Sequence, residues 1–480
     1  METDVLRTPQ AGARVIRGSA LRGLGYGAGI LLAAGTSVLL LRYLGVVDFG
    51  RYATVAALLG IVSGITDAGL TAVGSRELAV RKPADRAAVL RNLVALRLVV
   101  TPIGVGAAVL FALVAGYDST LVYGTLLGGL GVLLVNTQTT MMLPLSVELR
   151  LGALTAFEVA RAALTLAGVG LLVALGTGLL PFFAVQAAVG AVVLAATPLL
   201  LQRAGLLPAI DRAVAKMLVR EALPLAAALA MNVVYFRVLV ILTSLLGTAE
   251  ATGYFGTSFR IFEVLFGLPL LVLSVALPVL SVAGHEDEER LRYSLQRMTE
   301  VALAVAVLLV LVIVVLAEPA IVLLAGEDFR GAAPVLQIQA VALIGVFVGQ
   351  TWQLGLVAIR RQSALGWANG IALALVVALG FALIPAYGAT GAAVAAVLAE
   401  SALALLLLFF LRRERPGIVP RFGFAARIAL AGAVATPFLF VPMPALAAAA
   451  GAAGAFLAAA YVAGALPPEL LAAFRRGAVS

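Results

Sequence analysis

The sequence predicts an all-α integral membrane protein with about fourteen transmembrane helices. Of its 480 residues, 63% are hydrophobic and 12% are charged, whereas soluble proteins have about 45–50% apolar and about 25% charged residues. Apolar stretches of spanning length recur along the whole chain, and the basic residues collect in every second connection between them. This composition excludes a soluble enzyme, a nucleic-acid-binding protein and a disordered scaffold.

Fourteen stretches are long enough to cross a bilayer, because a spanning helix needs about 20 mostly apolar residues. We place them at residues 23–44, 52–75, 92–115, 120–147, 154–176, 180–202, 218–246, 252–283, 298–317, 333–358, 363–384, 389–411, 424–441 and 446–466. The first stretch lacks a small-residue cleavage site and is followed by another span, so we interpret it as a span and not as a cleaved signal peptide.

The basic residues predict the orientation of these spans. Of the 33 Lys and Arg residues, 25 lie in the two terminal segments and the even-to-odd connections, and the opposite connections hold only Arg42, Arg51 and Arg330. Cytoplasmic loops are the ones enriched in Lys and Arg. We therefore expect a multi-pass protein of the inner (plasma) membrane with both termini cytoplasmic. The net charge of +9 then matches anionic lipid headgroups rather than nucleic acid.

Metal and thiol chemistry are not expected. The chain has no Cys and a single His, His285, so it offers neither thiolates nor a multi-histidine metal centre.

An internal repeat predicts the domain organisation. Leu44-Gly45-x-x-Asp48-x-x-x-Tyr52 follows span 1, and Leu246-Gly247-x-x-Glu250-x-x-x-Tyr254 follows span 7 with the same spacing. Six spans per unit is an even number, so both units start on the same side, and a parallel repeat with a pseudo-two-fold axis along the membrane normal follows. We expect six-helix bundles at 1–203 and 204–416, and two additional helices with a cytoplasmic tail at 417–480.

Four segments resemble the motifs of a transporter family and keep its order over nearly the whole chain. They are Leu44-Gly45-Val46-Val47-Asp48-Phe49-Gly50-Arg51-Tyr52 with Asp67-x-Gly69-Leu70 and Arg76-Glu77, then Gly253-Tyr254-Phe255-x4-Arg260-Ile261, Leu324-Ala325-Gly326-Glu327-x-Phe329-x-x-Ala332-Ala333-Pro334, and Ile384-Pro385-x-x-Gly388-x-x-Gly391-Ala392-Ala393. Together they look like those of polysaccharide flippases, the O-antigen and exopolysaccharide transporters of the multidrug/oligosaccharidyl-lipid/polysaccharide exporter superfamily.

The resemblance implies two six-helix bundles around a central cavity that opens alternately to each side of the membrane. It also implies a substrate, an oligosaccharide repeat unit on an undecaprenyl pyrophosphate carrier, and polysaccharide assembly proteins as partners. Such a substrate combines a polar glycan, an anionic pyrophosphate and an apolar tail, so its transporter needs a wet cationic cavity.

Two arginines fit that requirement. Arg237 lies about eight residues before the end of its span and Arg260 about eight after the start of the next, so both are about 12 Å below the outer boundary. An arginine near the midplane costs roughly 2.5–3.5 kcal/mol, unless it meets water or an anion. We predict a cationic substrate site of Arg237 and Arg260 with the neighbouring Asn232, Tyr235 and Glu263. The alternative is a structural ion pair, because Glu263 is three residues from Arg260.

Three further acidic residues lie within spans. Asp67, near Gly64 and Gly69, could bind a coupling H⁺ or Na⁺, cap backbone groups freed at the glycines, or pair with an arginine. Glu400, near the middle of its span, is the second candidate for ion coupling, and no other cofactor is expected. Glu158 and Arg161 are three residues apart and predict a structural ion pair.

Other functions of the same or another class stay open. A lipid II flippase shares the need for a cationic cavity, and a cation-coupled multidrug antiporter would instead need an acidic, aromatic one. A membrane-embedded glycan polymerase or transferase needs exposed catalytic carboxylates or His, which the short external loops do not offer. We therefore expect a transporter and not an enzyme. The identity of the glycan, the coupling ion and the oligomeric state cannot be predicted from the sequence.

Overall fold

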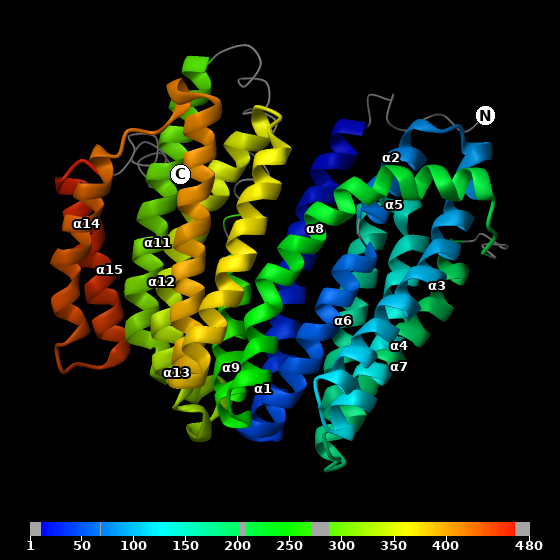
Figure 1. Cartoon of the computed structure of the whole chain (residues 1–480), viewed down its shortest axis with the longest axis horizontal. Coiled ribbons are helices and arrows are strands. Elements are labelled where there is room, and N and C mark those ends of the chain that lie inside the picture. The colour runs from blue at the N-terminus through cyan, green and yellow to red at the C-terminus, as the bar shows by residue number, and fades with distance from the viewer. Residues whose placement is uncertain (1–10, 68, 202–207, 268, 270–287, 466–480) are drawn as a thin grey trace. The chain divides into compact units, whose positions relative to one another are not determined.

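The structure is a computed structural model that describes residues 11–67, 69–201, 208–267, 269 and 288–465 (Figure 1). Every regular element within these residues is a helix, and no strand occurs there. The chain forms two compact units, Met1–Arg237 and Val238–Ser480, which we describe separately. The predicted limits of the six-helix bundles, at residues 203 and 416, are boundaries of the internal repeat and stay a prediction. His285 lies outside the described residues.

The predicted all-α, multi-pass membrane fold class is confirmed. Ten helices of the described residues are long and apolar enough to cross a membrane. Two of them, α1 and α13, each contain a non-helical glycine; α13 covers two predicted spans, and α1 covers one and the greater part of a second. The predicted spans 218–246 and 252–283 begin in two further helices, α8 and α9.

Among its described residues, unit 1 contains seven helices and the greater part of an eighth. They are α1 (Ala11–Asp67), α2 (Leu70–Val80), α3 (Pro83–Val114), α4 (Ser119–Met141), α5 (Leu143–Val147), α6 (Leu151–Ala174), α7 (Leu180–Leu201) and the first part of α8 (Arg212–Leu246). The structure breaks two predicted spans that the sequence treats as continuous. The stretch 52–75 is divided between α1 and α2, and the stretch 120–147 between α4 and α5.

Gly45 turns α1 back on itself. The helix has 57 residues, which would extend about 85 Å if it were straight, whereas the hydrocarbon core is about 30 Å thick. Gly45 has φ 68°, a left-handed conformation that glycine adopts without steric cost. Figure 1 accordingly shows two segments of α1 running in opposite directions. The first packs on α6, and the second packs on α3 and α4.

Polar contacts bring three predicted external turns of unit 1 to the same end. The guanidinium group of Arg51 lies 3.2 Å from Asp48 and 3.1 Å from Asp118, which joins the α1 turn to the start of α4. The Tyr43 hydroxyl donates to the carbonyl oxygen of Thr177 at 2.6 Å, which adds the α6–α7 turn. This arrangement agrees with the predicted alternation of the connections.

Unit 2 contains the end of α8 and the helices that follow it. They are α9 (Ala249–Phe266), α11 (Glu288–Ala325), α12 (Ala332–Ala358), α13 (Gln362–Glu414), α14 (Gly423–Ala435) and α15 (Ala445–Val462), with short 3₁₀ turns at Glu327–Phe329, Pro416–Ile418 and Thr436–Leu439. Gly388, with φ 54°, interrupts the 53-residue α13, as Gly45 interrupts α1.

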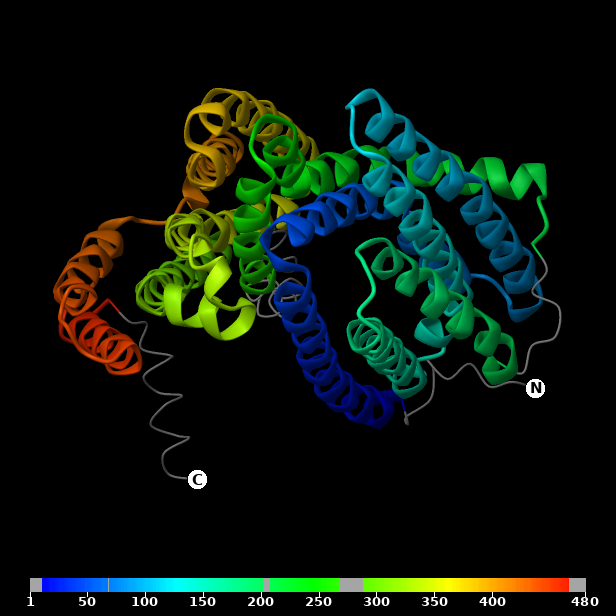
Figure 2. The same cartoon turned by 90° about the horizontal axis from the view of Figure 1, so that it is seen from below.

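The α14–α15 pair packs on α11 through a cluster of apolar side chains. Phe424 and Ile428 of α14 and Phe456 of α15 are buried together with Ala304 and Leu311 of α11. Figure 2 shows this pair, coloured orange to red, beside α11. The predicted hairpin of two additional helices is therefore a packed part of unit 2.

Candidate substrate and coupling residues

Arg260 lies on the face of α9 that does not pack in unit 2. Phe255, Phe259 and Phe262 are buried, and the Ser258 hydroxyl, also buried, donates to the side-chain oxygen of Gln339 on α12. The Arg260 side chain, by contrast, is 48% exposed. A charged side chain is thus presented about 17 Å from the helix start at 1.5 Å per residue, on a helix that also carries Glu250 and Glu263.

Arg260 also forms the ion pair that the sequence offered as an alternative. Its Nη1 donates to Oε2 of Glu263 at 2.9 Å. Where water reaches the half-exposed partner, such a pair contributes little, because water screens the charges. Pairing with Glu263 and exposure of the Arg260 side chain occur together, and the substrate role of both residues stays a prediction.

Arg237 occupies space that Gly60 leaves open. A Cβ atom at Gly60 of α1 would lie 2.7 Å from Cδ and Cζ of Arg237, so the guanidinium group passes directly over the glycine. The Cζ atom also lies 6.0 Å from the ring centroid of Phe236, within the range of a cation–π contact. Near Arg237 on α8, Asn232 is exposed and Tyr235 is buried.

The five predicted substrate residues fall on both units. Arg237, Asn232 and Tyr235 belong to unit 1, and Arg260 and Glu263 belong to unit 2. Their assembly into one cationic site stays a prediction.

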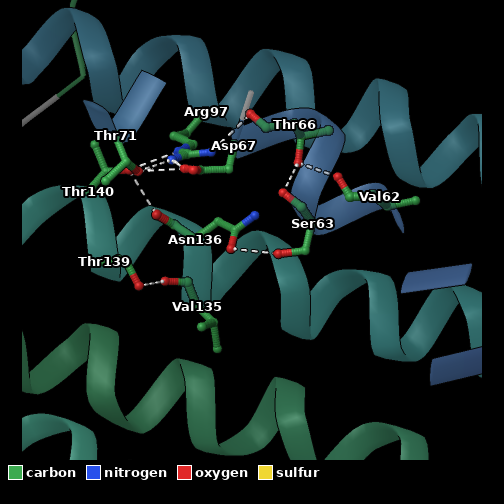
Figure 3. Close-up of polar contacts among 10 residues, drawn as sticks. All are labelled: Val62, Ser63, Thr66, Asp67, Thr71, Arg97, Val135, Asn136, Thr139 and Thr140. Carbon is green, nitrogen blue, oxygen red and sulfur yellow. Dashed lines mark hydrogen bonds and ion pairs between the residues drawn. The ribbon is translucent and has the colours of Figure 1, made fainter. Parts of the chain in front are cut away.

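Asp67 forms an ion pair with Arg97 of α3, a residue that the sequence did not single out (Figure 3). The Arg97 side chain is 2% exposed and that of Asp67 is 41% exposed. Of the three roles considered for Asp67, the structure contains the pairing with an arginine. A signal for it exists in the sequence, because Arg97 and Asp67 are the charged residues of neighbouring predicted spans on the cytoplasmic side.

Arg97 also joins the ends of two helices. Its Nη1 donates to the carbonyl oxygen of Thr66 at 2.9 Å, and its Nε donates to Oγ1 of Thr140 at 2.9 Å. Helix α1 ends at Asp67, and Gly69 has φ 76°, so the Thr66 carbonyl lies at a helix end where intrahelical donors run out. Arg97 supplies the missing donor. Thr140 lies one residue before α4 ends, so one guanidinium group reaches both interruptions.

A second polar contact connects the same helices closer to their middle. The Ser63 hydroxyl lies 3.3 Å from Oδ1 of Asn136, a contact between α1 and α4 (Figure 3). Together with Arg97, it gives unit 1 a polar seam between helices whose surroundings are apolar.

Glu400 is buried where α13 meets α12. A Cβ atom at Gly345 of α12 would lie 2.8 Å from the backbone carbon and oxygen of Glu400, so the two helices touch at this level. Its role in ion coupling stays a prediction.

One predicted ion pair is wrong. Glu158 is exposed, and it forms no ion pair with Arg161 although both lie in the described part of α6. A spacing of three residues allows such a contact on a helix, but the pair contributes only about 0.2–0.5 kcal/mol. This is too little to hold two side chains together when each can be hydrated by water instead.

No protein-family model matches the chain, and no curated protein matches it. Solved structures do match. The lipid II flippase MurJ in an inward closed conformation superimposes with a TM-score of 0.74 at 12% identity, covering 92% of this chain and 98% of that one.

Two further solved structures are transporters of the MOP superfamily. An inward-facing multidrug resistance MATE family transporter has a TM-score of 0.66 at 16% identity, and covers 81% of this chain and 95% of its own. A transporter from Pyrococcus furiosus, described as having a binding pocket of reverse polarity, has a TM-score of 0.56 at 16% identity, over 86% and 98% of the two chains. At such identities the similarity shows the fold: this chain has the fold of MOP-superfamily transporters.

Proposed function

We propose that the protein is a transporter that moves an undecaprenyl-pyrophosphate-linked oligosaccharide repeat unit across the cytoplasmic membrane by alternating access, for polysaccharide export. The observation that carries the proposal is the half-exposed guanidinium group of Arg260 on a helix predicted to span the membrane. A guanidinium group on such a helix is stable only where water or an anion meets it. Pyrophosphate is an anion that guanidinium groups bind through paired hydrogen bonds.

The fold supports transport, because the solved structures that share it are a flippase and MATE transporters. Arg237 supports an anionic substrate, since it adds a second cation on a predicted span. The partners in this proposal are the lipid-linked oligosaccharide, the bilayer and polysaccharide assembly proteins. A gradient of H⁺ or Na⁺ drives the cycle, with Asp67 or Glu400 as the coupling residue.

Lipid II is a second candidate substrate, and the superposition with the lipid II flippase favours it. It requires the same kind of cationic site. A cationic drug would instead need acidic groups, and the predicted cavity residues hold two arginines against one carboxylate.

The experiment is complementation in two bacterial strains. One strain lacks its repeat-unit flippase, and the other is depleted of its lipid II flippase. Restored surface polysaccharide in the first strain alone supports the proposal. Restored growth in the second strain alone would mean that the substrate is lipid II. Failure in both strains, with the protein abundant in the membrane, would contradict both candidates.

A further inference from the structure

The first part of α8 runs along the cytoplasmic end of unit 1, as the orientation above has it. It packs there on α2 and α3, and Figure 1 shows it lying across that end before the helix turns away. Leu218 and Ala222 are buried with Leu78 of α2 and Leu90 of α3. This face of α8 is therefore occupied by the protein itself.

Polar contacts hold this segment in place. The backbone N–H of Asp211 donates to Oδ1 of the buried Asn92 at 2.8 Å, and the Asp211 carboxylate accepts from the backbone N–H of Ala213 at 2.8 Å. Glu221 forms an ion pair with Arg76 of α2. The orientation of the helix about its own axis is thus defined by contacts on the packed side.

The opposite face carries basic and large apolar side chains in alternation. Arg212, Lys216 and Arg220 are exposed, as are Val219 at 41% and Leu223 at 65%. At 3.6 residues per turn these five positions fall within an arc of about 100°. In the described part of the chain, no ion pair involves any of the three basic residues.

We propose that this face, the α8 basic face (Arg212, Lys216, Val219, Arg220 and Leu223), binds anionic phospholipid headgroups of the cytoplasmic leaflet. A helix that lies in the membrane interface combines apolar side chains, which enter the acyl boundary, with Lys and Arg that reach the headgroups. Val219 and Leu223 share this face with the three basic residues, which is the combination that such a helix presents. The helix continues into the apolar stretch Ala230–Leu246, so the segment lies next to a membrane span.

The charge of the leaflet complements the face. The cytoplasmic leaflet carries a negative surface potential, and each Lys or Arg near it contributes about fivefold to binding. Three such residues on one face give a combined effect of about a hundredfold. The proposal is independent of the transported substrate, because it concerns the docking of unit 1 on the leaflet.

The test measures phospholipid binding to the full-length protein purified in a neutral detergent. Dioleoyl-phosphatidylglycerol is titrated, and bound lipid is counted by native mass spectrometry, with dioleoyl-phosphatidylcholine as the reference lipid. We expect Arg212→Gln/Lys216→Gln/Arg220→Gln to lower the affinity for phosphatidylglycerol ten- to about a hundredfold, with no change for phosphatidylcholine. Arg212→Lys/Arg220→Lys should bind as the wild type, because charge and not the planar guanidinium shape is required.

The matched control removes the same charge elsewhere. Lys82, Arg412 and Arg413 are exposed basic residues of predicted cytoplasmic loops, and their triple substitution by Gln should lower the affinity clearly less than the α8 triple variant does, because these charges lie in two separate loops and do not share one face with large apolar side chains. An equal loss in this control would mean a non-specific effect of net charge and would overturn the proposal. So would unchanged binding in the α8 triple variant.

Two further arms keep the test decisive. Glycerol 3-phosphate, added in excess, should not displace the lipid, and displacement would show a site for soluble phosphate instead. If the triple variant does not fold, as judged by its melting temperature, Lys216→Gln alone should lower the affinity about fivefold. Unchanged affinity in a folded Lys216→Gln variant would contradict the proposal.

Discussion

The buried guanidinium group of Arg97 on α3 is paired with Asp67, the last residue of α1. The same guanidinium donates to the backbone carbonyl of Thr66. The two residues therefore neutralise each other within the apolar part of unit 1, and Arg97 supplies a hydrogen-bond donor to a carbonyl at the end of α1. The loss of folding free energy should therefore differ between removing Asp67 and removing Arg97.

Removing the carboxylate should destabilise the protein more than removing the guanidinium. Asp67→Asn leaves a fully buried cation without a counter-charge, which costs about 3 kcal/mol or more. Arg97→Gln leaves a carboxylate that is partly exposed and can be hydrated. We expect the double variant to be more stable than the sum of the single effects predicts, by at least about 1 kcal/mol. Thermal unfolding in detergent measures all four proteins.

The exposed pair of Glu289 and Arg292 is the control for this double-mutant cycle of wild type, two single variants and the double variant. Its atoms lie 3.3 Å apart and its side chains are 86% and 44% exposed, so its coupling energy should stay below about 1 kcal/mol. Equal coupling in the two cycles would contradict the structural role of the Asp67–Arg97 pair.

The same pair allows a sharper test of ion coupling at Asp67. Asp67→Asn alone confounds lost coupling with lost stability, whereas Asp67→Asn/Arg97→Gln restores the charge balance. If Asp67 carries the coupling ion, the double variant should be abundant in the membrane and its transport should no longer respond to the H⁺ or Na⁺ gradient. Transport that keeps its normal gradient dependence would exclude Asp67, and Glu400→Gln would be examined next.

Gly60 should be required for the position of Arg237. Gly60→Ala places a methyl group where the Arg237 side chain lies, and the flexible side chain must move away. We expect normal membrane levels and a transport rate lowered about tenfold, which corresponds to about 1.4 kcal/mol. Gly106→Ala on α3 is the control, because nothing lies within 4 Å of the added atom. Equal transport rates in both variants would contradict a role of Arg237 in substrate binding.

The predicted topology can be measured with reporter fusions. The contacts among Arg51, Asp118 and Asp48 bring predicted external turns together, but the side of the membrane is a prediction from the basic residues alone. A reporter active outside the cytoplasm should give signal when fused after Asp118, Gly178 or Tyr387, and none when fused after Arg86, Arg212 or Arg415. Reversal at two or more positions would overturn the orientation, and with it the leaflet assigned to the α8 basic face.

Much of the fold could be predicted from the sequence because lipid imposes strong constraints on it. A spanning helix must be apolar over about 20 residues, so the spans stand out, and the Leu-Gly spacing marked the turn at Gly45. The break at Met142 was not predicted, and Gly69 was considered only as a place where Asp67 could cap freed backbone groups. Both breaks lie inside apolar stretches, and Arg97 of α3 contacts both: it donates to the Thr66 carbonyl at the first and to the Thr140 hydroxyl at the second.

The site residues were harder to predict for the same reason. Hydropathy gives the depth of Asp67 and Arg97 in their spans, but pairing depends on which faces of α1 and α3 meet. The pair of Arg260 and Glu263 was predictable, because a separation of three residues on one helix places both side chains on one face. The Glu158–Arg161 pair had the same spacing and is not formed, so spacing alone does not decide whether two exposed side chains meet.

Glu263→Gln separates the two interpretations of Arg260. If the ion pair is structural, the substitution leaves an unpaired cation and the amount of protein in the membrane should fall. If Arg260 faces a wet space, the variant should be as abundant as the wild type. Quantification in membrane fractions, with Arg260→Lys for comparison, makes this distinction.

The most direct test of an anionic, lipid-linked substrate is its translocation in proteoliposomes. Purified wild type, Arg260→Ala, Arg237→Ala and the double variant are reconstituted with a labelled undecaprenyl-pyrophosphate-linked oligosaccharide, and Arg427→Ala on α14 serves as the control arginine. Each lost charge-assisted hydrogen bond is worth about 1.5–3 kcal/mol, so we expect translocation to fall by at least about tenfold in each single variant and further in the double variant, with Arg427→Ala unchanged. Full translocation by a correctly inserted double variant would contradict the account.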